Sequence, residues 1–171
     1  MLRHALEQLV DEHDRAGSPL RSSLRPGLAG EEVSAAFAAL RVEPNSSVVE
    51  LYGWADGTDA GVWRSFSPSS DPSPVFGYGF TPLDSTVATA ALLLDELGPH
   101  GLWKREWCPV FWSQTAGYVV DMADESVWFI TADDIVRARM ADNLEEFVLG
   151  LVADWRSGEY YFDVGHGVQP R

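Results

Sequence analysis

Histidines and acidic residues are the first side chains to consider for catalysis or metal binding. The chain has four histidines, at positions 4, 13, 100 and 166. No two of them have the i, i+4 spacing by which a helix presents paired metal ligands. The run Asp11-Glu12-His13-Asp14 contains metal-binding residue types. On a helix, however, Glu12 and His13 point away from Asp11 and Asp14, so the run favours a solvated acidic face.

Two other groups near the C-terminal half could carry chemistry. Asp163 and His166 could form a metal-binding or proton-transfer pair, but nothing upstream supplies a third ligand motif. The single cysteine, Cys108, lies in an apolar run with only Lys104 and Arg105 as nearby cations, which predicts a buried, inert thiol. We therefore expect no catalytic residues, no metal site and no cofactor, and hence a protein that is not an enzyme.

Five helices are predicted from apolar spacing and end signals. The first is amphipathic and is separated from the rest of the chain by a Gly-Ser-Pro break. The third begins with Ser47 and Glu50 at capping-box spacing and ends at the turn residues Asp56-Gly57. The fourth has Asp84 as its N-cap and Gly98 as its stop. The predicted helical ranges are 2–15, 30–41, 47–55, 84–97 and 142–155.

Three short strands are predicted between the last two helices, over residues 108–112, 117–121 and 127–131. The spacers between them are too short for a parallel crossover, so antiparallel pairing follows. Residues 58–74 form a long Gly-, Ser- and Pro-rich loop with at most one short strand. The pattern as a whole predicts an α+β fold with short N-terminal helices, an antiparallel-rich central sheet, a long middle helix and a closing C-terminal helix.

The charge balance restricts the kind of partner. A formal net charge of −14 over 171 residues disfavours binding to nucleic acid or to a membrane surface, which are themselves anionic. The same charge would attract a basic protein at long range. Acidity that serves only to keep the protein soluble is the alternative. One cysteine, no apolar run of membrane-spanning length and a charged first segment predict a cytoplasmic location.

Six stretches of the sequence resemble, in their order, the segments of the SUKH superfamily. They include an "LY-x-W-x-x-G" element and a "W-x-P-V-F" strand. The resemblance covers roughly residues 24–160 and divides the chain into an N-terminal helical arm (1–23), a SUKH-like domain (24–160) and a C-terminal tail (161–171). The matching stretches are Leu28–Leu40, Val49–Thr58, Phe80–Asp84, Trp107–Phe111, Gly117–Asp121 and Asn143–Phe147.

The resemblance implies protein binding and no catalysis. Bacterial members of the family are mostly thought to be immunity proteins that neutralise toxin domains, many of them nucleases, and the founding fungal members regulate cell-wall assembly. A nuclease has a basic active face, which an acidic inhibitor would complement. The sequence therefore predicts an immunity protein for a basic toxin domain. The alternative is a regulatory scaffold that binds several cellular proteins. The oligomeric state is left open.

Candidate partner-binding residues are of two kinds. Trp63 and Trp103 lie beside cationic residues, where they could be exposed interface anchors or lids folded over the core. Acidic residues near predicted loop ends form the second kind, and those around residue 121 would cluster at one end of the sheet. Solvated turn residues are the alternative for each of these acids. The acidic candidates are Asp56, Asp59, Asp121, Asp124, Glu125, Asp133 and Asp134.

Overall fold

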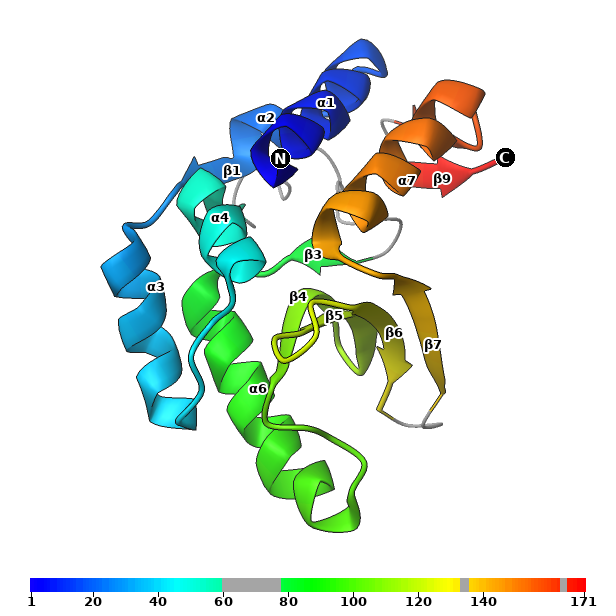
Figure 1. Cartoon of the computed structure of the whole chain (residues 1–171). Helices are drawn as coiled ribbons and strands as arrows, with labels where there is room; N and C mark the ends of the chain where they lie inside the picture. The colour runs from blue at the N-terminus through cyan, green and yellow to red at the C-terminus, as the bar shows by residue number, and fades with distance from the viewer. Residues whose placement is uncertain (60–77, 133–135, 164–165) are drawn as a thin grey trace.

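The structure is a computed structural model that describes residues 1–59, 78–132, 136–163 and 166–171. It has the predicted α+β fold, built on a five-stranded antiparallel sheet of order β3-β4-β5-β6-β7 (Figure 1). The helices are α1 (Leu2–Arg15), α2 (Leu20–Ser23), α3 (Gly30–Phe37), α4 (Ser46–Trp54), α6 (Leu83–Leu97) and α7 (Leu144–Ser157), with 3-10 turns η1 (Ala38–Leu40) and η2 (Gly98–His100). The strands of the sheet are β3 (Gly79–Phe80), β4 (Trp107–Ser113), β5 (Ala116–Asp121), β6 (Val127–Thr131) and β7 (Arg137–Ala141).

The central strands pair as the sequence predicts. Residue Trp107 of β4 lies opposite Asp121 of β5, and Val120 of β5 lies opposite Val127 of β6, in antiparallel register. Both connections are short turns, as antiparallel pairing requires. β7 was not predicted, because it has none of the β-branched or aromatic residues that favour strands, and four of its five residues are exposed.

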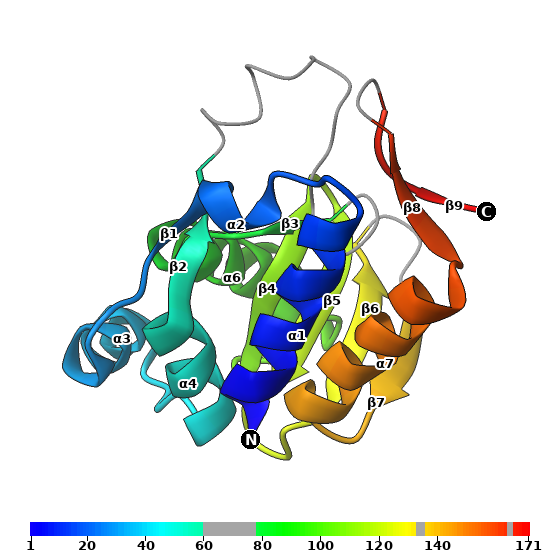
Figure 2. The ribbon, with the colours of Figure 1, turned by 90° about the horizontal axis from the view of Figure 1, so that it is seen from above.

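Helices cover both faces of the sheet. α1 and α7 lie side by side across one face, as both views of the ribbon show (Figures 1 and 2). On the other face, Leu93 of α6 packs with Val119 and Ile130. None of the helices in the described ranges has the length and apolar content required to cross a bilayer.

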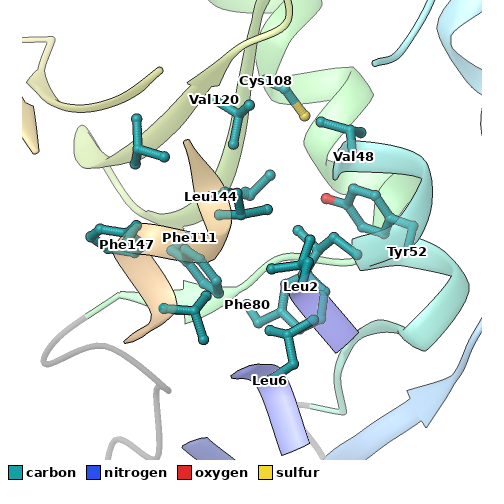
Figure 3. Packing of buried hydrophobic residues seen from close by; sticks show 14 of the residues in the cluster. Leu2, Leu6, Val48, Tyr52, Phe80, Cys108, Phe111, Val120, Leu144 and Phe147 are labelled. Atoms are coloured by element: carbon teal, nitrogen blue, oxygen red, sulfur yellow. The ribbon is translucent and has the colours of Figure 1, made fainter. Parts of the chain in front are cut away.

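The first helix packs into the main core. Leu2 and Leu6 of α1 are buried in one cluster with Val48, Phe80 and Leu144 (Figure 3). Complete burial of a leucine side chain is worth about 1.5–3 kcal/mol, so several such residues hold α1 firmly. The predicted N-terminal arm is therefore docked on the rest of the chain.

The C-terminal tail also contacts the core. It forms a hairpin of β8 (Tyr160–Asp163) and β9 (Gly167–Pro170), which the sequence did not predict. Val168 is 2% exposed and belongs to the main cluster, and Tyr160 and Phe162 pack against it. A further two-stranded sheet joins β1 (Leu24–Pro26) to β2 (Ala55–Thr58).

The predicted start and end of α4 were both wrong. The N-cap of α4 is Asn45, whose Oδ1 accepts a hydrogen bond from the Val48 N–H at 3.0 Å, so Ser47 lies inside the helix. Asp56-Gly57 is not a terminating turn, because the chain continues there as β2. Gly57 does need to be glycine: its φ is +72°, and a Cβ atom would lie 2.5 Å from the Pro82 nitrogen.

The limits of α6 also differ from the prediction. The helix begins at Leu83, so Asp84 lies in its first turn and is not the N-cap. Gly98 does not stop it but continues into η2, and the left-handed residue is Gly101, at φ +68°. The terminating glycine predicted from the sequence, Gly98, therefore lies one 3-10 turn before the residue that takes the left-handed conformation, Gly101.

Candidate acidic binding site

Asp56 is a structural residue. It is 5% exposed, and its Oδ1 accepts a hydrogen bond from the Leu83 N–H at 2.8 Å. Its Oδ2 lies 2.7 Å from the Arg25 guanidinium. The Asp56 carboxylate thus satisfies the free Leu83 N–H group at the start of α6. The predicted cap Asp84 accepts instead from the N–H group of the next residue, Ser85, at 2.7 Å. It is unavailable to a partner in this conformation.

Asp121, at the end of β5, is held in the same way. It is 1% exposed and accepts hydrogen bonds from Lys104 Nζ at 2.8 Å and from Trp107 Nε1 at 3.0 Å. The Ala123 N–H donates to its second oxygen at 3.1 Å. Through these hydrogen bonds Asp121 connects the β5–β6 turn to the loop before β4, so it too is a structural residue.

The next two acids of this turn are exposed. Asp124 accepts hydrogen bonds from the Ser126 hydroxyl and from the Ser126 N–H, the latter at 3.0 Å. These hydrogen bonds hold the pKa of the Asp124 carboxyl below its ordinary value, and the bond from the Ser126 hydroxyl has the larger effect. Glu125 has a left-handed backbone with φ 66°. Its Oε1 lies 3.4 Å from the Ser47 hydroxyl, which donates to it from the first turn of α4.

Glu125 borders a solvent-open cavity of about 280 Å³ that we call the acidic pocket. The N-terminal ends of α1, α4 and α7 converge on it, at the edge of the molecule where the chain starts in Figure 2. Three glutamates line it: Glu50 from α4, Glu125 from the β5–β6 turn and Glu145 from the first turn of α7. The full lining is Met1, Leu2, Ser46, Ser47, Glu50, Glu125, Asn143, Leu144 and Glu145.

Each of the three carboxylates that line the pocket has a partner. Glu50 Oε1 accepts a hydrogen bond from the Arg3 N–H of α1 at 2.9 Å. Glu145 forms an ion pair with the Met1 amino group. Helix N-termini carry partial positive charge and unpaired N–H groups, which stabilise nearby anions. The pocket therefore concentrates negative charge on a scaffold of three helices, an arrangement that suits a lysine or arginine side chain.

The sequence did not single out Glu50 and Glu145 as binding candidates. Glu50 was assigned only to a capping box, and Glu145 only to the start of the last helix. Glu145 lies in the first turn of α7, after the N-cap Asn143, whereas Glu50 is the fifth residue of α4. No local signal is shared by the two glutamates, and only the fold brings them to one pocket.

Trp103 is a lid over the core. It is 4% exposed, and its ring meets Trp107 and Trp112 edge to face, with centroids 5.2 and 5.8 Å away. Within the described part of the chain its buried Nε1 has no hydrogen-bond partner. The prediction of an exposed interface anchor is therefore wrong for Trp103, and the lid alternative holds.

The remaining candidates divide between the surface and the segments that are not described. Asp59 is exposed at the end of β2, where its N–H donates to the Ser23 carbonyl at 2.7 Å. Trp63, Asp133 and Asp134 lie outside the described residues. Of the acidic candidates that the structure describes, only Glu125 lines the acidic pocket.

The residues first considered for chemistry differ in their exposure. Cys108 is fully buried, and burial raises the pKa of its thiol. His166 Nδ1 lies 2.8 Å from Asp163 Oδ1 in an exposed pair. Over residues 1–59, 78–132, 136–163 and 166–171, no three His, Cys, Asp or Glu side chains gather as a metal ion would require.

Asp11 and Asp14 are exposed, as the predicted solvated face requires, and Glu12 and His13 point away from them into the protein. Glu12 contacts α7. It is 8% exposed and accepts a hydrogen bond at 2.6 Å from Nε of Arg156, on α7. The hydrogen bond from the Arg15 guanidinium, more than any other contact, holds the pKa of the Glu12 carboxyl below its ordinary value. His13 is fully buried, with its ring centroid 4.3 Å from that of Trp155. The interface of α1 with α7 is thus partly polar.

Neither a scan against protein-family models nor a search of curated proteins found a match to this chain.

Proposed function

We propose that the chain is a non-enzymatic protein-binding domain that neutralises a basic toxin domain, such as a nuclease, by stoichiometric binding. The acidic pocket is the observation that carries this proposal, because it gathers Glu50, Glu125 and Glu145 on one face of a chain with net charge −14. The resemblance to the SUKH superfamily supports the same function.

The pocket suits binding by occlusion. Its carboxylates are held by the Arg3 N–H, the Met1 amino group and the Ser47 hydroxyl. A basic side chain would therefore meet a site that is already ordered, which lowers the entropic cost of association. The surrounding negative charge would speed the encounter by about 10–10³-fold at low salt. A partner that must hold nucleic acid on a basic face would lose that face on binding.

Affinity capture from the lysate of the native cell tests the proposal, with partners identified by mass spectrometry at about 50 and about 300 mM salt. The bait is compared with a triple variant, Glu50→Gln/Glu125→Gln/Glu145→Gln. A matched control changes three other exposed acids: Glu31→Gln/Glu43→Gln/Glu96→Gln. We expect one dominant basic partner, bound 1:1, that is lost at high salt and from the triple variant but is retained by the control.

A different capture pattern would favour the scaffold alternative. Several partners that are indifferent to salt, bound equally by the wild-type protein and the triple variant, would overturn the immunity proposal. Equal loss of the partner from the triple variant and from the control would mean that net charge acts alone, and would remove the pocket from the interface.

A further inference from the structure

β7 forms one edge of the five-stranded sheet, and its outer side is open. In the part of the chain that the structure describes, β7 pairs with β6 and with no other strand. Figure 1 shows it at the rim of the molecule with no element beyond it. Residues Arg137 to Met140 are all exposed. An open edge strand is a template on which another extended chain can pair.

The backbone register shows which groups the edge offers. The Thr131 N–H donates to the Val136 carbonyl at 3.1 Å, and Phe129 lies opposite Ala138. Hydrogen-bonded and non-hydrogen-bonded pairs alternate along an antiparallel ladder. Arg137, which lies between Val136 and Ala138, therefore directs its own N–H and carbonyl away from β6, towards an added strand.

The side chains of this edge are basic. Arg137 lies opposite Ile130 and Arg139 lies opposite Trp128, so the two guanidinium groups project from the same face of the sheet. Among the described residues, Arg137 has no carboxylate partner and donates to the Leu102 carbonyl at 2.6 Å. Arg139 pairs at 2.9 Å with Asp142, whose side chain is 74% exposed. A salt bridge this exposed is weak and can be exchanged for another.

These charges select among possible strands. A second copy paired through β7 would bring arginines of both copies together, and like charges on neighbouring strands are destabilising. A basic segment would meet the same repulsion. An extended segment with carboxylates at alternate positions would place them all on one face, where the two guanidinium groups lie. Two exposed apolar side chains, Val136 and Met140, flank the site and would contact the same segment.

We propose that the outer edge of β7 binds an extended acidic segment of a partner protein, which joins the sheet as a sixth strand. The edge lies outside the acidic pocket and takes a ligand of opposite charge, so this site is independent of the proposed toxin-binding function.

The test uses the full chain labelled with ¹⁵N and a short synthetic peptide in which Glu alternates with Thr. Titration should give saturable NMR shifts centred on β7, and bound peptide should slow hydrogen exchange of the Arg137 amide at least about tenfold. An analogue with Gln in place of Glu should bind at least about tenfold more weakly. Two further peptides are N-methylated, one at its Glu residues and the other at its Thr residues. Only one of them should fail to bind, because alternate N–H groups of a strand point in opposite directions and only one set faces β7.

Protein variants provide the second arm. Arg139→Glu should weaken binding at least about tenfold, whereas Arg41→Glu, an equal charge change at an exposed residue after η1, should change it less than about twofold. The proposal would be overturned by NMR shifts that do not saturate. It would also be overturned if both protein variants lost affinity equally, or if both N-methylated peptides bound like the parent peptide. The peptide series uses the unaltered protein, so it decides the matter even if a variant folds poorly.

Discussion

Carboxylates occupy two contrasting regions of this molecule. Asp56 and Asp121 are buried, and each is surrounded by a cation and by backbone or indole N–H donors. The glutamates of the acidic pocket lie at the surface, on α4, on α7 or in the β5–β6 turn. The first group holds elements of the fold together, whereas the second presents charge to solvent. Acidic residues therefore serve two purposes in this protein. The burial of each carboxylate shows which purpose it serves, whereas the net charge of the chain does not.

The largest effect on stability is expected from Asp121→Ala. The substitution leaves the buried Trp107 Nε1 and the Ala123 N–H without their acceptor and removes the partner of Lys104. We expect the free energy of unfolding to fall by about 2–4 kcal/mol, as measured by urea denaturation. Lys104→Met, which removes only the half-exposed cation, should cost less than about 1 kcal/mol. Equal costs for the two variants would contradict the structural role assigned to the carboxylate.

A smaller loss is expected from Asp56→Ala. This change removes the acceptor for the Leu83 N–H and the partner of Arg25, which is itself 42% exposed at its side chain. Loss of a helix cap and a partly exposed ion pair should cost about 1–3 kcal/mol in urea denaturation. Asp84→Ala, at the residue that the sequence predicted as the cap, should cost under about 0.5 kcal/mol. The reverse ranking would restore Asp84 as the cap.

Glu12 lies between the two groups, because it is buried but belongs to a polar helix interface. Its folded pKa is lowered below the ordinary value of 4.5, with the Arg15 hydrogen bond as the largest cause. A lowered pKa stabilises the folded state fully above the ordinary value, and the stabilisation is lost as pH falls through the folded pKa. Wild type should therefore be more stable than Glu12→Gln at pH 7, and the difference should shrink below about pH 4.5. A difference that stays constant between pH 7 and pH 3 would contradict this.

The sequence predicted the fold better than the site, for a physical reason. The apolar stripe of α1 and the runs of β4, β5 and β6 are local patterns, and all of these elements formed within about one residue of the predicted ends. β7 carries Arg-Ala-Arg-Met-Ala, which has no β-branched or aromatic residue, so its pairing with β6 is what makes it a strand. Sequence spacing cannot show that Glu50, Glu125 and Glu145 meet, because they come from three separate elements. Nor could it show that Asp56 caps a helix 27 residues away.

The smallest effect on stability is expected from the pocket variant Glu50→Gln/Glu125→Gln/Glu145→Gln. Removing three charges loses their attraction to helix N-termini but also relieves their mutual repulsion, and these terms oppose each other. We expect the free energy of unfolding to change by less than about 1 kcal/mol in urea denaturation. The same variant should slow association with the captured basic partner about tenfold or more at low salt, and by much less at high salt. A stability loss as large as that of Asp121→Ala would instead place the pocket carboxylates with the buried ones, as part of the fold.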